Sequence, residues 1–274
     1  MKVTVLVENT VGRTLPIFGE HGLSLWLEFD GHKVLFDTGH CGSVVTNAFR
    51  LGVDLRAAEA VILSHGHSDH TGGLRDVLNL IGRPVPVYGH PDIFSGHRVS
   101  SPADRYVGIP FSREELEAAG AEFVLVEQPL EAFAGFWLSG EVPRRTPFEK
   151  GDPRMYVYQG TEQVPDPVAD DLSLYIETPA GLVILLGCAH AGVVNIIEHA
   201  RAVTGVNKVA AILGGTHLGP VAPEQMEATV SYLKELDLKL LAANHCTGLP
   251  KAAYLAGIFG ERFSFAPAGE SFEF

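Results

Sequence analysis

The stretch His65-Gly66-His67-Ser68-Asp69-His70 decides how the rest of the chain is interpreted. It places three imidazoles and one carboxylate within six positions, directly after the apolar run 60–64, which predicts a buried strand. A metal site needs several such groups aimed at one point, and the end of a core strand holds them rigidly. The pattern therefore predicts a metal site, in preference to an ordinary polar surface turn.

The composition is that of a globular protein with an acidic surface. Of the 274 residues, 46% are hydrophobic and 19% are charged, and 20 basic against 33 acidic side chains give a net charge of −13. This length suits one large domain or two small ones. Because an acidic surface repels phosphate backbones, we expect no nucleic-acid partner.

No segment of the sequence predicts a membrane span or a targeting signal. No stretch approaches the roughly 18 uncharged apolar residues that a span requires. Residues 1–8 alternate like a strand and do not resemble a signal peptide. The three cysteines are odd in number and far apart, so a disulfide framework is not expected. These observations predict a cytoplasmic protein with no membrane partner, and they leave the oligomeric state open.

Strands dominate the first part of the chain, and strands alternate with helices in the last third. The Asp30-Gly31 pair predicts a hairpin between two of the early strands. Ser43 is expected to cap a helix that ends near Leu51 and turns Phe49 toward the core. The predicted strands are 3–7, 23–29, 33–37, 60–64, 83–88, 172–178, 182–186, 208–213 and 238–243, and the predicted helices are 43–51, 71–81, 191–203, 223–236 and 251–260.

Residues 91–170 are the least regular part of the sequence. They contain a helix candidate at 112–119 and strand candidates at 122–126 and 133–139, and residues 140–169 are expected to form a long loop. Long irregular segments within a compact domain usually carry function. We therefore predict a single domain over residues 1–274, in which 91–170 is an insert that sets substrate specificity.

Three further histidines follow apolar strands in the second half. They stand in the motifs Gly187-Cys188-Ala189-His190, Gly214-Gly215-Thr216-His217 and Asn244-His245-Cys246-Thr247-Gly248. Strands of one sheet bring their ends together, so residues that are distant in sequence can meet at one edge. We expect these strand-end groups to build a joint site.

These motifs together resemble those of the metallo-β-lactamase superfamily over the whole length of the chain. His65-x-His67-x-Asp69-His70 resembles the signature of the superfamily, and Asp37-Thr38-Gly39 resembles its supporting aspartate motif. The resemblance implies an α+β fold, a four-layer αββα sandwich with a metal site at the sheet edge. It also implies one or two divalent ions, with zinc expected first and manganese or iron as alternatives.

The resemblance also implies roles for individual residues. The expected metal ligands are His65, His67, Asp69, His70, His190 and His245, and Asp69 is also the expected catalytic residue. Asp37 is expected either to accept a hydrogen bond from a ligand histidine or to cap the loop that follows it. Cys188 stands where the superfamily commonly has a bridging aspartate, so His190 is favoured as the substitute ligand and a Cys188 thiolate is the alternative.

Within the superfamily the chain resembles the branch of 7,8-dihydropterin-6-methyl-4-(β-D-ribofuranosyl)aminobenzene-5′-phosphate synthase and its bacterial metal-dependent hydrolase relatives. This implies a metal-dependent enzyme that acts on a small phosphorylated substrate, either by hydrolysis or by condensing a pterin pyrophosphate with an arylamine. The alternative is a non-catalytic metal-binding or sensor protein that retains the fold. Additional substrate or metal contacts are expected from His217, Cys188, Glu141 and Arg144, and Arg144 would bind phosphate.

Overall fold

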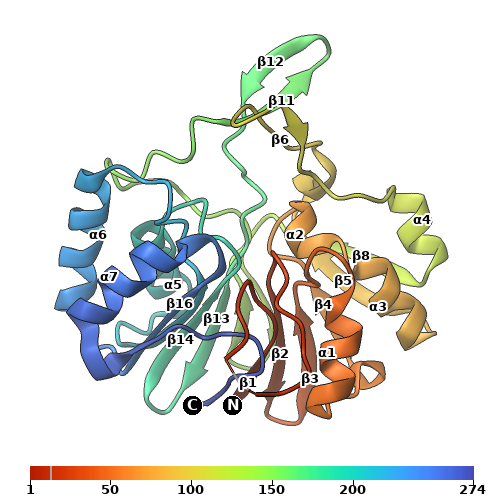
Figure 1. The fold of residues 1–274 in the computed structure, drawn as a ribbon, viewed down its shortest axis with the longest axis horizontal. Coiled ribbons are helices and arrows are strands. Elements are labelled where there is room, and N and C mark those ends of the chain that lie inside the picture. The colour runs from red at the N-terminus through yellow and green to blue at the C-terminus, as the bar shows by residue number, and fades with distance from the viewer. Residues whose placement is uncertain (13) are drawn as a thin grey trace. The chain divides into compact units, whose positions relative to one another are not determined.

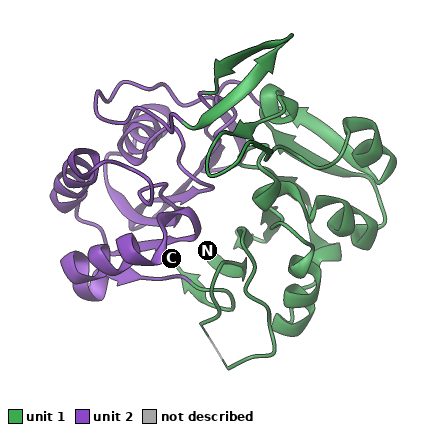
Figure 2. Cartoon of the chain, turned by 45° about the horizontal axis from the view of Figure 1, so that its top comes forward, with its two compact units in different colours: residues 1–125, 154–166, 267–274 green, residues 126–153, 167–266 purple. Residues whose placement is uncertain are grey.

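The computed structural model describes residues 1–12 and 14–274. By its internal contacts the chain forms two compact units, which Figure 2 distinguishes by colour. Unit 1 comprises 1–125, 154–166 and 267–274, and unit 2 comprises 126–153 and 167–266. Both combine sheets with helices, so the predicted α+β class is confirmed. That residues 1–274 act as one domain stays a prediction.

Unit 1 is built on a seven-stranded sheet in the order β18-β1-β2-β3-β4-β5-β8. Helices α1 and α3 pack on this sheet through a shared apolar core that includes Val44, Leu74 and Leu78 (Figure 1). Its elements are β1 Lys2–Val7, β2 Ser24–Phe29, β3 His32–Phe36, α1 Ser43–Leu51, η1 Leu55–Ala57, β4 Ala60–Ile62, α2 Ser68–Thr71, α3 Leu74–Ile81, β5 Val85–Gly89, η2 Pro91–Phe94, β6 Arg98–Val99, β7 Arg105–Tyr106, α4 Arg113–Ala118, β8 Ala121–Leu125, β11 Met155–Gln159, β12 Glu162–Pro165 and β18 Ser271–Glu273.

Unit 2 is built on a second seven-stranded sheet in the order β17-β16-β15-β14-β13-β10-β9. Helices α5, α6 and α7 contribute to one apolar core with β14, β15 and β16. Its elements are β9 Leu130–Phe133, β10 Phe136–Leu138, β13 Leu174–Thr178, β14 Gly181–Leu186, α5 Val193–Thr204, β15 Val209–Gly215, α6 Pro223–Glu235, β16 Leu240–Asn244, η3 His245–Thr247, α7 Leu249–Phe259, η4 Gly260–Arg262 and β17 Phe263–Ser264.

Parallel pairing explains where the functional motifs lie within each unit. In unit 1, β3 pairs in parallel with β4, and in unit 2, β14, β15 and β16 are successive parallel neighbours. Parallel strands end at the same edge of a sheet. The residues that follow these strands therefore collect at one edge in each unit.

Most of the predicted elements are present, and the Asp30-Gly31 hairpin is among them. Asp30 and Gly31 have φ values of 47° and 86°, as a two-residue turn with a left-handed backbone requires, and β2 and β3 pair in antiparallel fashion on either side. No helix in the described part of the chain is long and apolar enough to cross a membrane.

Helix α1 corrects two expectations. Its N-cap is Gly42, with φ 80° and no side-chain cap hydrogen bond, so Ser43 is the first helical residue and does not cap the helix. The Phe49 side chain is 83% exposed, so it does not face the core as expected. Val44, Asn47 and Ala48 form the buried face instead.

The predicted long loop at 140–169 is also corrected. It contains the hairpin β11–β12, which joins β6 and β7 in a four-stranded sheet within unit 1. In Figure 1 this hairpin extends away from the seven-stranded sheet of its unit. The insert at 91–170 is therefore divided, with 91–125 and 154–166 in unit 1 and the remainder in unit 2.

Candidate metal centre

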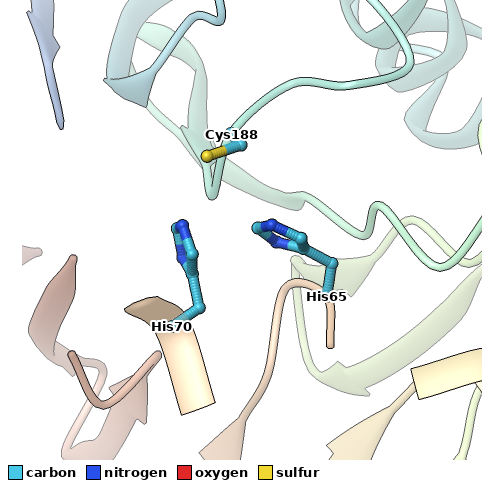
Figure 3. A group of neighbouring side chains, drawn as sticks. All are labelled: His65, His70 and Cys188. Carbon is cyan, nitrogen blue, oxygen red and sulfur yellow. The ribbon is translucent and has the colours of Figure 1, made fainter. Parts of the chain in front are cut away.

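The histidine motif of unit 1 forms a compact, buried group of imidazoles. His65 follows β4, His67 occupies the N-cap of α2, and His70 lies within that helix. The ring centroid of His65 lies 4.4 Å from that of His67 and 4.3 Å from that of His70. His65 and His70 are fully buried, and Figure 3 shows their side chains. The structure thus brings together the three imidazoles of the motif.

Asp37, at the end of β3, supports two of these histidines. Its Oδ2 lies 2.6 Å from His70 Nδ1, and its two carboxylate oxygens accept hydrogen bonds from the Ser64 N–H and hydroxyl, each at 2.7 Å. Because the Ser64 hydroxyl donates to Asp37, it accepts from His65 Nδ1 at 2.8 Å. The expected contact between Asp37 and a motif histidine is therefore present.

This network indicates which ring nitrogen of His65 and of His70 carries the proton. With Nδ1 of His65 and His70 protonated and donating, their Nε2 atoms retain lone pairs. His65 Nε2 lies only 2.8 Å from His67 Nδ1. A cation that binds imidazole lone pairs fits this donor set, because neutral, oriented imidazoles are what a divalent metal requires of histidine.

Asp69 lies beside these imidazoles in a more accessible position. Its side chain is 19% exposed, and its Oδ2 lies 3.3 Å from Nε2 of His21 and 4.0 Å from Nε2 of His70. The Asp69 carbonyl accepts a hydrogen bond from the N–H of Leu23. His21 was not among the predicted site residues, because it stands alone in a segment without periodicity.

A second group next to the motif, His97 with Asp166, was also missed. His97 Nδ1 lies 2.6 Å from Asp166 Oδ2, and both side chains are buried. The His97 ring packs edge-on against that of His67, with 5.1 Å between centroids. Gly66 permits this approach, since a Cβ there would lie 3.1 Å from His97 Nε2 and 2.2 Å from the Ile93 carbonyl oxygen. The two residues are 69 positions apart, so no local pattern could reveal the pair.

In unit 2 the strand ends place histidines and cysteines together. Cys188 follows β14, His217 follows β15, and His245 and Cys246 follow β16. One ligand atom each from Cys188, His190 and His217 lie within 4.8 Å of one another, and so do those of Cys188, His245 and Cys246. The expected meeting of strand ends is thus observed within this unit. Cys188 belongs to both groups and is drawn in Figure 3.

The loop that carries His190 is held from two sides. Arg144 Nη1 donates to the His190 carbonyl oxygen at 2.6 Å, and Arg144 Nη2 donates to the carbonyl of Pro167. On the other side, the Ala191 N–H donates to Asp171 Oδ2 at 2.8 Å. Burial raises the pKa of Asp171 to about 6. Arg144 therefore orients the polypeptide that presents His190.

The predicted substrate contacts Glu141 and Arg144 line a cavity of about 180 Å³ in unit 2, together with Asp171. Two carboxylates face one guanidinium there, and that guanidinium already donates to backbone carbonyls. This charge balance favours a structural role for Arg144 over an anion site. Phosphate binding by Arg144 stays a prediction.

His217 lies between a carboxylate and a thiol. Its Nε2 is 3.5 Å from Asp152 Oδ2, its backbone N–H donates to Cys246 Sγ at 3.2 Å, and its ring centroid lies 4.3 Å from that of His190. Burial lowers the pKa of His217, but its interactions with Asp152 and Cys246 outweigh burial and raise this pKa to about 9. His217 thus belongs to the same group as His190.

Left-handed backbone marks these strand ends. Positive φ values occur at Asp37 after β3, Ala189 after β14, His217 after β15 and His245 after β16, at 59°, 57°, 50° and 49°. A non-glycine residue in this conformation costs about 1–3 kcal/mol and is found most often where function requires it. The strain at each strand end supports a functional role for the side chains presented there.

Comparison with known proteins agrees with this geometry. Residues 18–202 match the metallo-beta-lactamase superfamily. The 7,8-dihydropterin-6-methyl-4-(beta-D-ribofuranosyl)-aminobenzene-5′-phosphate synthase of Methanocaldococcus jannaschii is 31% identical over 284 aligned positions, which cover 100% of this chain and 97% of that protein. A ribonuclease Z of Clostridium kluyveri is 30% identical over 119 positions, 40% of this chain and 37% of that one.

A solved structure shows the same fold. The crystal structure of a metal-dependent hydrolase of the β-lactamase superfamily matches with a TM-score of 0.84 and 25% identity, covering 100% of this chain and 99% of that one. This confirms the predicted fold class. From its motifs, its fold and its relatives, the chain belongs to the metallo-β-lactamase superfamily.

Proposed function

We propose that this protein is a metal-dependent enzyme that acts on a small phosphorylated molecule. The observation that carries the proposal is the buried imidazole group of unit 1, whose protonation is fixed by Asp37 so that lone pairs remain for a cation. Buried histidines that donate one ring N–H to a carboxylate or to a group it orients are typical of metal ligands. The Asp69 carboxylate lies beside this imidazole group and is partly exposed, so it can accept a proton from a nucleophile bound there.

The proposed metal ligands in unit 1 are His65, His67, Asp69 and His70. Membership of the superfamily adds His190 and His245 as proposed ligands, each of which follows a parallel strand of unit 2. The proposed metal is zinc, with manganese or iron as alternatives, since imidazole and carboxylate accept all three.

A bound divalent ion would lower the pKa of water and stabilise negative charge on a phosphoryl oxygen. The Asp69 carboxylate would accept the proton of the attacking nucleophile, and Asp37 would hold His70 in the required tautomer. In hydrolysis the nucleophile is water and a phosphoester bond breaks. In condensation the nucleophile is an arylamine nitrogen, and pyrophosphate leaves from the pterin methyl carbon.

The condensation is favoured by the 31% identical synthase, and hydrolysis by the 25% identical hydrolase structure. We propose small molecules as substrates and not RNA, because the net charge of −13 opposes a polyanion. A cytoplasmic location stays a prediction.

The test compares Asp69→Asn with Asp30→Asn, the same chemical change at an exposed turn. Initial rates are measured on phosphomonoesters, phosphodiesters and the pterin pyrophosphate–arylamine pair, and metal content is measured on the same samples. We expect Asp69→Asn to keep metal while its rate falls about 10²–10⁴-fold, and Asp30→Asn to match the wild type. Unchanged rates in Asp69→Asn would show that Asp69 has no catalytic role. A metal-loaded wild type without turnover on any of these substrates would favour the binding or sensor protein.

A further inference from the structure

Unit 2 contains two thiols and an imidazole that converge at the ends of β14 and β16, the two parallel strands on either side of β15. Ligand atoms of Cys188, His245 and Cys246 lie within 4.8 Å of one another. Cys188 and His245 are 3% and 4% exposed. Ligand atoms around a tetrahedral zinc ion lie about 3.5 Å apart, given bonds of about 2.0–2.3 Å. Small side-chain rotations would therefore bring these three groups to ligand spacing.

The backbone around this cluster provides space for sulfur. A Cβ on Gly215, the last residue of β15, would lie 2.6 Å from Cys246 Sγ and 2.5 Å from the Gly187 carbonyl oxygen. Any residue other than glycine would therefore displace the Cys246 side chain. The His217 N–H donates to Cys246 Sγ at 3.2 Å, as it would to a thiolate.

The turn that carries His245 and Cys246 is preorganised as well. His245 has φ 49°, and Gly248 at the end of the same 3₁₀ turn has φ 70°. Thr247 Oγ1 bonds to the hydroxyl of Thr216 at 2.8 Å and accepts the Thr216 N–H at 3.2 Å, which ties this turn to the end of β15. A strained turn fixed at both ends is suited to holding ligands in place.

We propose that Cys188, Cys246 and His245 bind a thiophilic divalent cation through two thiolates and one imidazole. Cys188 is the central ligand, since it also lies within 4.8 Å of His190 and His217 ligand atoms, either of which can complete four-coordination. Both thiols release a proton to solvent as the cation binds. Thiolates select zinc, cobalt(II) or iron(II) over magnesium or calcium, which prefer oxygen ligands.

This inference rests on the proposed function in one respect, because His245 is a proposed ligand in both. It adds sulfur to a ligand set that otherwise contains only nitrogen and oxygen. Sulfur ligands have a spectroscopic signature that nitrogen and oxygen lack, so the two proposals can be tested separately on one sample.

The experiment is a cobalt(II) titration of the metal-free, full-length protein, followed by absorption in the visible and near-ultraviolet regions. We expect visible bands from bound cobalt together with an intense sulfur-to-cobalt charge-transfer band. Cys188→Ser and Cys246→Ser should each weaken the charge-transfer band, and the double variant should lose it. The matched control is Cys41→Ser, at the exposed cysteine of unit 1, which should keep the full band.

The wild-type spectrum alone separates the two proposals. Visible cobalt bands without a charge-transfer band in the wild type would overturn thiolate ligation and leave the proposed function intact. No cobalt bands at all would overturn both. A charge-transfer band that persists in the double variant would also overturn the assignment of Cys188 and Cys246.

Discussion

The two units present their candidate ligands in different ways. In unit 1 the ligands are consecutive, from His65 to His70, and one carboxylate supports them through side-chain hydrogen bonds. In unit 2 they come from three separate strand ends and include sulfur. They are held in place by left-handed backbone at Ala189, His217 and His245. The Arg144 guanidinium adds a hydrogen bond to the His190 carbonyl.

The two groups therefore depend on different kinds of support. The unit 1 group depends on the charge and geometry of Asp37, so a change at that residue should alter the imidazoles directly. The unit 2 group depends on backbone conformation and on side chains that bind backbone groups near the ligands: Arg144 donates to the His190 carbonyl, and Glu149 accepts the N–H groups of Val194 and Asn195 at the start of α5. Changes at these residues should therefore reach the ligands through the loops.

The largest effect is expected from Asp37→Ala in unit 1. Loss of the carboxylate removes the acceptor of His70 Nδ1 and of the Ser64 hydroxyl, so neither His70 nor His65 keeps a fixed tautomer. Removing such a supporting residue typically lowers metal affinity about 10–100-fold. Chelator competition with a metal-binding dye measures this affinity.

The control for this experiment is Asp30→Ala, an exposed turn residue of the same unit. It should leave metal affinity unchanged. Equal affinity in Asp37→Ala and wild type would show that the carboxylate does not organise the site.

A smaller effect is expected from Arg144→Ala in unit 2. The substitution leaves the carbonyls of His190 and Pro167 without their charged donor, which should cost about 1–2 kcal/mol of unfolding free energy. Urea denaturation measures the change. Arg144→Lys retains the positive charge but lacks the two guanidinium nitrogens that donate to His190 and Pro167. It should therefore recover only part of the lost unfolding free energy.

The same variants decide between the two roles of Arg144. If it binds a substrate phosphate instead, Arg144→Ala should raise KM strongly and leave the urea midpoint in place. That result would contradict the inference that Arg144 stabilises the backbone at His190 and Pro167.

The smallest effect is expected from Glu149→Gln at the start of α5. The Glu149 carboxylate accepts the N–H groups of Val194 and Asn195, each at 2.9 Å, and glutamine offers only one acceptor. We expect a change of less than about 1 kcal/mol at neutral pH, because the lost acceptor lowers stability while removal of a buried negative charge raises it. Denaturation at fixed pH measures it, and a loss above that of Arg144→Ala would reverse the expected order.

Glu149 should also contribute to the pH dependence of stability. Burial raises the pKa of Glu149 above its usual value of 4.5, against the lowering effect of the helix N–H groups. A carboxyl with a raised native pKa stabilises the fold below pH 4.5, and this contribution is lost as pH rises through the native pKa. Glu149→Gln should flatten that part of the curve of unfolding free energy against pH. An identical curve in both proteins would contradict the shift.

The contrast between the units also explains what the sequence could predict. The unit 1 ligands are adjacent after an apolar strand, so their chemistry is visible locally, and the strand-end histidines of unit 2 were found because parallel strands end at one edge. The supporting contacts were harder to find. His97 with Asp166, and Arg144 with His190, join residues far apart in sequence, and single residues such as these carry no periodic signal.

The secondary structure shows the same limit. Helices and strands with clear periodicity were predicted within a few residues, and α4, Arg113–Ala118, lies within the predicted helix 112–119. The hairpin β11–β12 was missed because its strands do not alternate between buried and exposed residues: Met155 and Tyr156 are both buried, and the residues that follow are half-buried or exposed. Phe49 was misplaced because an apolar side chain does not have to face the core.

Metal binding by the unit 1 histidines is tested by the metal content of protein purified without chelator, measured by elemental mass spectrometry. The wild type is compared with the double variant His65→Ala/His67→Ala, and circular dichroism checks that the variant is folded. We predict one or two divalent ions per wild-type chain and a folded variant that has lost at least one of them. A wild type that stays metal-free after incubation with zinc, manganese and iron, or a folded variant with unchanged metal content, would contradict the account.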